Sequence, residues 1–278
     1  MDETPQRDPA TRSDDETVST DDETTPRDDG TTATDELPPA ERHSARAALY
    51  SAAAGAFCYP DEETVAQLTH EATAEGLREA GRKLGFETET EALVEALDAT
   101  DRESLESAYN DLFGLPVDDG TYPVVPYEAE YTVGDEVGRQ QRRIATVVGL
   151  LEAFGVEPSD DFDERQDHVV VELELLQVLA ARRAVARDEG DDDTADNLER
   201  AEAMVLDEHV EGFVPAFAHD VRETTPDPSD DAEGDRTAAS SVYRAAANLA
   251  EAVVTRDLAD HPEPEVDFEA STEVRSRA

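Results

Sequence analysis

The sequence predicts an all-α protein, built as a single multi-helix bundle. Two observations support this fold class. Apolar residues recur at helical spacing in segments throughout the middle of the chain. Alanine and leucine, which favour helices, are plentiful, and no two segments form a convincing pair of strands. The length of residues 40–257 suits one domain, so we expect one helical domain there.

The expected helices begin and end at recognisable signals. They span Glu41–Cys58, Glu62–Leu84, Glu89–Leu97, Thr100–Phe113, Gly134–Phe154, Asp167–Arg187, Asp193–Asp207, His209–Arg222 and Ser241–Arg256. Pro60 ends the first because the residue before a proline avoids the helical region. Thr100 and Glu103 form a T-x-x-E capping box at the start of the fourth. Pro215 lies inside a helical stretch, which predicts a kink or break near Val214.

Four segments are expected to lie outside these helices. Residues 1–39 are rich in carboxylates and almost lack large apolar side chains, which is typical of a disordered acidic tail. Residues 224–239 repeat that composition and predict a flexible acidic loop. Residues 258–278 predict a disordered C-terminal tail. Residues 115–131 contain three prolines and predict an ordered loop.

The charge of the chain indicates its setting more than its function. Asp and Glu number 70, Lys and Arg number 23, and Lys83 is the sole lysine. Carboxylates are also spread between apolar residues of the helical region, which favours a folded protein adapted to concentrated salt over an acidic tail protein. We infer a halophilic, archaeal source, where a Debye length of about 3 Å screens self-repulsion. The lack of basic patches argues against nucleic-acid binding.

Several classes of protein are excluded by what the sequence lacks. Cys58 is the single cysteine, so no internal disulfide forms. No signal peptide and no apolar run of about 18 residues is present, so we expect no membrane span and a cytoplasmic location. No G-x-S-x-G, phosphate-binding loop or H-E-x-x-H motif occurs. We therefore expect no enzyme, no catalytic residues and no cofactor.

The polar segment Glu164–His168 precedes the most apolar predicted helix and has three interpretations. Asp167 could cap the helix, with His168 held by a hydrogen bond. The segment could grip a partner peptide. His168 and Glu172 could instead ligate a metal, although di-iron bundles need a second matching pair that this chain lacks. We assign no metal ligand, and a helical carboxylate and histidine metal protein that also uses His209 stays the alternative.

Two further motifs each have a structural and a functional interpretation. Tyr109, Leu112 and Phe113 share one helix face, a spacing that is usually core. The segment Tyr122–Tyr131 holds three tyrosines and two prolines. Such rings often anchor interfaces, and the alternative is a well-packed connector.

The order of these motifs resembles the TorD/DmsD-like family of molybdoenzyme-specific chaperones, which is related to the nitrate reductase assembly chaperones. The matching segments are Phe57–Asp61, Tyr109–Phe113, Pro126–Tyr131, Glu164–Leu173 and His209–Phe217, with a Tyr-led closing helix at Ser241–Arg256. Two positions depart from the family pattern, since Ala129 replaces a serine and Phe213 replaces a tryptophan. The resemblance covers about Ala45–Asp257.

The resemblance implies an all-helical, TorD-like chaperone of the cytoplasm that binds the twin-arginine signal peptide, the apo form, or both, of a molybdopterin oxidoreductase. It would assist cofactor insertion before export. Carried over by position, the peptide-binding residues are Leu112, Phe113, Pro126, Tyr127, Asp167 and His168. At high salt we expect apolar contacts to dominate affinity. The client, of the dimethyl sulfoxide, trimethylamine N-oxide or nitrate reductase type, stays open, as do homodimerisation and nucleotide binding.

Overall fold

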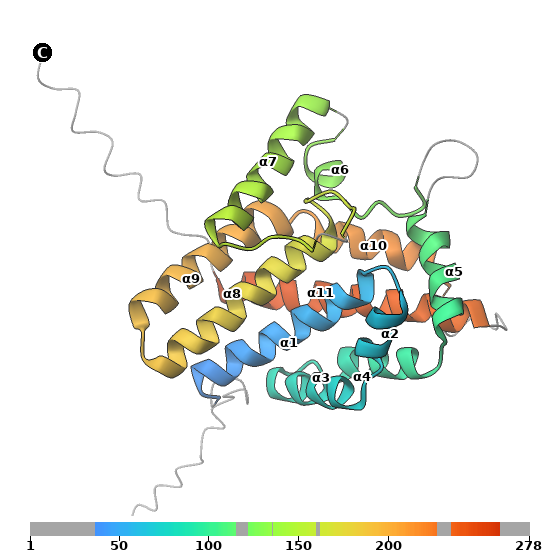
Figure 1. Cartoon of the computed structure of the whole chain (residues 1–278), viewed down its shortest axis with the longest axis horizontal. Coiled ribbons are helices and arrows are strands. Elements are labelled where there is room, and N and C mark those ends of the chain that lie inside the picture. Colours follow the sequence, from blue (N-terminus) through green and yellow to red (C-terminus); the bar gives the residue numbers. More distant parts are fainter. Residues whose placement is uncertain (1–36, 115–121, 135, 160–161, 227–234, 262–278) are drawn as a thin grey trace, which may run out of the picture. The chain divides into compact units, whose positions relative to one another are not determined.

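The computed structural model describes residues 37–114, 122–134, 136–159, 162–226 and 235–261. All of them belong to one compact unit, residues 32–278. The helices are α1 Pro39–Phe57, α2 Glu62–Leu68, α3 Glu71–Leu84, α4 Glu87–Asp98, α5 Arg102–Phe113, α6 Glu128–Thr132, α7 Val137–Ala153, α8 Val169–Glu189, α9 Asp192–Val205, the π-helix η2 Leu206–Val210, α10 Val214–Thr224 and α11 Asp235–Asp260. Figure 1 shows them. No strand occurs in the described residues, so the predicted all-α class is confirmed.

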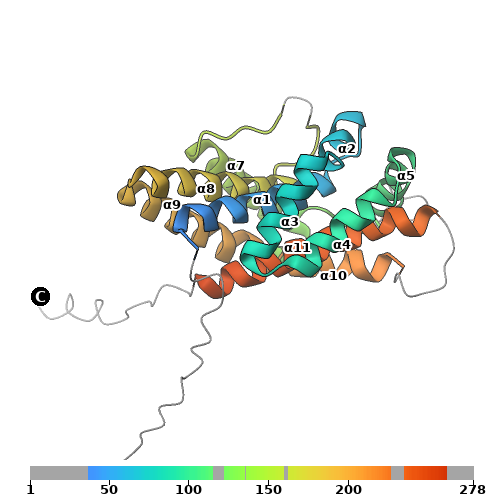
Figure 2. The same cartoon turned by 90° about the horizontal axis from the view of Figure 1, so that it is seen from below.

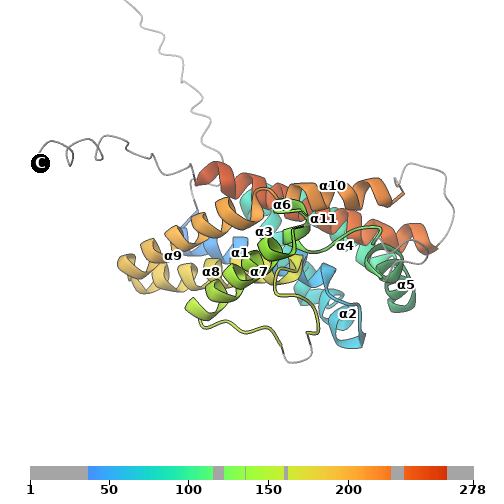
Figure 3. The ribbon, with the colours of Figure 1, turned by 90° about the horizontal axis from the view of Figure 1, so that it is seen from above.

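The core is built around α1, α8 and α11, which pack against one another in the order α8, α1, α11. α8 is buried on most sides, with Leu173, Leu176 and Leu179 fully enclosed. α1 contributes small side chains such as Ala53 and Ala54, which allow close helix packing. α3 and α4 pack on α1 and α11 (Figure 2), while α6 and α7 lie on the opposite side of the unit (Figure 3). No helix among the described residues has the length and hydropathy to span a membrane.

One expected helix is divided in two, and one expected N-cap was wrong. The predicted helix Glu62–Leu84 is split into α2 and α3 at His70, whose Nδ1 accepts a hydrogen bond from the Ala72 amide and so begins a new helix. The N-cap of α5 is Asp101, whose Oδ1 accepts from the Ser104 amide at 2.8 Å. Thr100 was predicted for that position, and its hydroxyl has no partner. Both Thr and Asp cap helices, so the sequence alone does not choose between neighbours.

The C-terminal half also departs from expectation. The predicted break near Val214 is confirmed, because α10 begins there with Pro215 in its first turn, where proline needs no hydrogen-bonding amide. The residues before it form η2 and a turn instead of a helix from His209. α11 begins at Asp235 and reaches Asp260. Residues 235–239 of the expected loop and residues 258–260 of the expected tail are therefore helical. Residues 227–234 and 262–278 lie outside the described residues, as does the predicted N-terminal tail up to residue 36.

One buried group of charges joins α1, α8, α9 and α11, and we name it the Arg46 cluster (Arg46, Arg183, Glu202 and Asp257). Arg46 donates to both oxygens of Asp257, at 3.0, 2.9 and 2.6 Å. The guanidinium groups of Arg46 and Arg183 both donate to Glu202 Oε2, at 3.2 and 2.8 Å. Each carboxylate thus has a guanidinium partner, and each side chain is at most 7% exposed.

Candidate functional site

The segment after residue 121 is fastened to the start of α8 by its backbone. The Glu128 amide donates to the Asp167 carbonyl at 2.8 Å, and the Val169 amide donates to the Pro126 carbonyl at 2.8 Å. These bonds form an isolated antiparallel bridge. Because the bridge pairs one residue of each segment, the bonds mainly fix the position of Tyr127 beside the start of α8.

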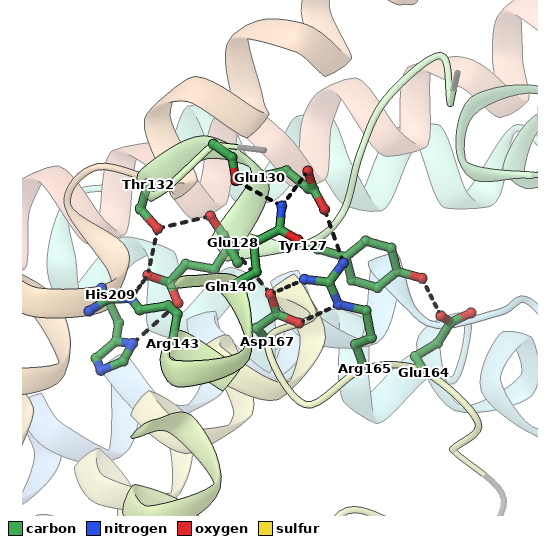
Figure 4. A network of polar contacts seen from close by, with 12 residues as sticks. Tyr127, Glu128, Glu130, Thr132, Gln140, Arg143, Glu164, Arg165, Asp167 and His209 are labelled. Carbon is green, nitrogen blue, oxygen red and sulfur yellow. Dashed lines mark hydrogen bonds and ion pairs between the residues drawn. The ribbon is translucent and has the colours of Figure 1, made fainter. Parts of the chain in front are cut away.

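Arg165 occupies a cage made of Tyr127, Glu130 and Asp167 (Figure 4), which we name the Arg165 cage. Its guanidinium makes a bidentate pair with Asp167 at 2.9 and 2.7 Å and reaches Glu130 at 3.1 Å. The guanidinium carbon also lies 4.4 Å from the centre of the Tyr127 ring. The Tyr127 hydroxyl donates to Glu164 at 2.6 Å. Two carboxylates and an aromatic face together form a receptor for a planar cation.

Tyr127 keeps its phenolic proton in this setting. Partial burial, with the hydrogen bond to Glu164 and the charge of that carboxylate, raises the pKa of Tyr127 above its ordinary value. The hydroxyl therefore acts as a donor, and the ring face stays available beside the cage. Tyr127 is the partly exposed member of the six residues predicted to bind peptide.

Asp167 and His168 are both buried, and the residue that caps α8 is His168 and not Asp167. Asp167 was expected to cap α8, but its carboxylate serves Arg165 and also accepts from the Ala129 amide at 3.1 Å. The N-cap of α8 is His168, whose Nδ1 accepts from the Val170 amide at 3.2 Å. Burial, with the charge of Arg165, lowers the pKa of His168 to about 3, so the imidazole is neutral. The expected hydrogen-bonded histidine is confirmed and the capping aspartate was wrong.

Leu112 and Phe113 lie at the end of α5, inside the core. The rings that contact Phe113 are those of Phe57, Tyr109, Phe217 and Tyr243. Phe113 is 8% exposed and Leu112 is 4% exposed. One backbone bond, from the Val124 amide to the Leu112 carbonyl at 3.0 Å, joins this helix end to the segment that leads to the cage.

The structure therefore divides the six predicted residues into two groups. Four gather where the segment meets α8, namely Pro126, Tyr127, Asp167 and His168. The other two belong to the aromatic core. The role of all six residues in peptide binding stays a prediction, and the link between Leu112 and the segment at α8 is the backbone bond from Val124.

A second group of polar side chains lies beside the cage, and we name it the Glu128 triad (Glu128, Glu172 and His209). The three come from α6, α8 and η2 and are 0%, 1% and 1% exposed. Arg143 donates to Glu128 Oε1, while His209 Nδ1 lies 3.3 Å from Glu128 Oε2. Burial, with the charge of Glu128, raises the pKa of Glu172. The metal interpretation from sequence used His168, His209 and nearby glutamates; among the described residues, the group close enough to share an ion contains His209 and Glu172 but not His168.

Sequence reasoning missed the two arginines of this region. Arg165 and Arg143 each hold one buried carboxylate, yet neither was predicted as a site residue. The composition contains one usable signal, which is the scarcity of basic residues. Because the chain has 23 basic residues among 278, an arginine inside the Glu164–His168 motif is unusual. Such an arginine beside an aspartate that becomes buried is expected to pair with it.

A comparison with protein families matches residues 62–219 to the family described as nitrate reductase delta subunit. The matched range runs from α2 into α10 and contains the Arg165 cage and the Glu128 triad. Searches of curated proteins and of solved structures gave no match.

Proposed function

The chain belongs to the nitrate reductase delta subunit family, and from this membership we propose that it binds the twin-arginine signal peptide of a molybdopterin oxidoreductase. The family consists of maturation chaperones for molybdoenzymes, which act on the catalytic subunits of those enzymes. We further propose that this chain does so in the cytoplasm, holds its client until the cofactor is inserted, and has no catalytic role.

The observation that carries the peptide proposal is the Arg165 cage. A twin-arginine peptide presents guanidinium groups, and the cage already holds one. Asp167 supplies the bidentate carboxylate, Glu130 a second negative charge, and Tyr127 the aromatic face. Arginine is suited to such a site because its planar fork matches a carboxylate, while a lysine ammonium is a point charge.

In this proposal an arginine of the peptide takes the place of Arg165. The Arg165 side chain is 33% exposed and can turn outward to water, whereas Asp167 is fully buried and cannot. Asp167 is paired with a guanidinium both before and after the exchange, so neither state has the cost of a bare buried carboxylate. Because Asp167 is buried, its pairing also resists screening by salt better than exposed pairs do.

The apolar part of the peptide then packs on the Tyr127 ring. The His168 ring packs edge-on against the Tyr127 ring, and the backbone bond from Val169 to Pro126 holds the segment beside α8. Replacing Phe113 by alanine would open the core, whereas replacing Tyr127 changes the surface itself. Tyr127 is the position at which peptide binding can be tested without disturbing the fold.

The test is a titration of the full chain, in molar KCl, with the signal peptide of each candidate molybdoenzyme client. We expect saturable binding to one peptide and at least about tenfold weaker binding to its Lys-Lys version. Tyr127→Ala should weaken binding by about tenfold, while Tyr127→Phe, which keeps the ring, and Glu174→Ala, at an exposed site on α8, should stay within about twofold.

Arg165→Ala separates exchange from simple addition. If the peptide arginine replaces Arg165, this variant binds as tightly as the wild type or more tightly, because its cage is already vacant. Weaker binding by Arg165→Ala would mean that Arg165 itself contacts the peptide. Binding to the mature client body alone would favour the nitrate reductase type of client, and binding to no peptide and no client body would overturn the proposal.

A further inference from the structure

Three buried ligand-type side chains meet beside the cage without forming a complete set of hydrogen bonds. One oxygen each from Glu128 and Glu172 and one ring nitrogen of His209 lie within 4.8 Å of one another. They come from three separate elements, α6, α8 and η2. With Glu172 taken as a carboxylate, both of its oxygens are buried and have no hydrogen-bond partner, and the same holds for Nε2 of His209; a protonated Glu172 would instead share its proton with Glu128.

The charges of this group do not balance. Arg143 pairs with Glu128 Oε1, and this pair is neutral as a whole. Glu172 is left over, at 1% exposure, with a second carboxylate as its neighbour. An unpaired buried carboxylate is costly, and native proteins pair such groups or use them to coordinate a metal. A cation between Glu172 and Glu128 would remove that cost.

We propose that Glu128, Glu172 and His209 form a site for one divalent transition-metal cation of the Zn²⁺ class. Two carboxylates and one imidazole are ligands that Zn²⁺ takes at about 2.0–2.2 Å, with a fourth position open to water. Two ligands of a tetrahedral ion at such bond lengths lie about 3.3 Å apart. The 3.3 Å between His209 Nδ1 and Glu128 Oε2 equals that separation.

The surroundings of Glu128 support a ligand role. Arg143 and the Thr132 hydroxyl both donate to Oε1, which orients the carboxylate and leaves Oε2 directed at His209. Hydrogen bonds of this kind hold ligands in place in many metal sites. His209 lies on η2, and short π-helical segments are frequent at functional sites.

A bound cation would join α6 to α8 and to η2. Tyr127 immediately precedes α6, so the cation would also fix the segment that carries the exposed ring of the cage. The proposed metal site does not depend on the proposed peptide binding. Its ligands are all buried residues of this chain, and metal binding is measured without any peptide.

The test uses the full chain after treatment with a chelator, in molar KCl to suppress weak binding by surface carboxylates. Co²⁺ is titrated and followed by its visible absorption, and Zn²⁺ is measured by competition with a chromophoric chelator. We expect one cation per chain and the strong absorption of a four- or five-coordinate Co²⁺ site. Zn²⁺ should also raise the melting temperature.

The decisive variants are Glu172→Gln and His209→Asn, with Glu174→Gln as the matched control on the exposed side of α8. The first two should lose at least about 100-fold in Zn²⁺ affinity, and the control should lose none. Glu172→Gln keeps the shape of the side chain, so loss of the fold is not expected and circular dichroism checks it. Equal affinity in wild type and Glu172→Gln, or the absence of saturable binding at one cation per chain, overturns the proposal.

Discussion

Two clusters of charged side chains are buried in the described part of this protein, and they differ in balance. The Arg46 cluster holds two guanidinium groups, Arg46 and Arg183, against two buried carboxylates, Glu202 and Asp257. The Glu128 triad holds two buried carboxylates against one guanidinium, that of Arg143, which is 19% exposed. Both clusters join several helices, so their position in the fold does not explain the difference.

The difference indicates which cluster balances its charges by itself, although Glu202 Oε1 and Arg183 Nε are also buried without a hydrogen-bond partner. In the Arg46 cluster each carboxylate has its own cationic partner, and the Tyr50 hydroxyl adds a hydrogen bond to Asp257 at 2.6 Å. Such a group can serve packing and specificity alone. In the Glu128 triad, Glu172 needs something that the chain does not supply, either a proton or a cation. Imbalance in a buried cluster is therefore a better guide to a binding site than the mere presence of buried charge.

Removing one partner of the balanced cluster should have the largest effect on stability. Arg46→Leu removes the guanidinium that pairs with Asp257 and one of the two guanidinium groups that donate to Glu202, so we expect a loss of about 3–5 kcal/mol in the free energy of unfolding. Urea unfolding in molar KCl measures it. The control is Arg78→Ala, which breaks the exposed pair with Glu91 and should cost under about 1 kcal/mol. Equal losses in the two variants would contradict the assignment of the Arg46 cluster as a structural centre.

The same substitution in the two clusters should act with opposite signs. Glu202→Gln removes a charge that two guanidinium groups share, and we expect a loss of about 3 kcal/mol. Glu172→Gln removes a carboxyl group that has no cationic partner and that must take up a proton to stay buried without a metal, and in chelator-treated protein we expect a gain of about 1–2 kcal/mol. Both variants are compared with the wild type by urea unfolding. A loss of stability in both would mean that Glu172 has a partner that the geometry does not reveal.

The fold of this chain could be predicted from its sequence, because long helices carry several turns of apolar periodicity. α1, α7 and α8 were located this way, with ends displaced by a few residues. α6 and η2 were missed because one turn of helix is too short to show a period. Cap positions were uncertain because neighbouring residues such as Thr100 and Asp101 both have side chains that can cap a helix.

The site could be predicted only in part. The motif around Asp167 was found, but its partner was not, since pairing with Arg165 is decided by how the chain turns before α8. The burial of Phe113 depends on rings such as Phe217 and Tyr243, which are distant in sequence. Periodicity reports on neighbours along one helix, so contacts between distant segments cannot be derived from it.

The smallest expected effect concerns His43, which is buried beside the balanced cluster. Burial, with the charges of Arg183, Arg46, Arg42 and Arg187, lowers the pKa of His43 from 6.5 to about 3. The unfolded chain therefore binds a proton between pH 6.5 and 3 that the folded protein does not bind, so stability falls as the pH drops below 6.5. His43→Asn removes this loss and keeps an acceptor for Arg46 Nη1, which His43 Nδ1 contacts at 3.2 Å.

We expect the unfolding free energy of His43→Asn, relative to the wild type, to improve by about 1 kcal/mol between pH 7.5 and 5.5, a figure reduced for screening by solvent. Urea unfolding at the two pH values, with both proteins in the same salt, gives this difference directly. Carboxylates that titrate in the same range affect both proteins equally and cancel. A difference that does not change with pH would mean that neither burial nor the four arginines lower the pKa of His43 in the folded protein.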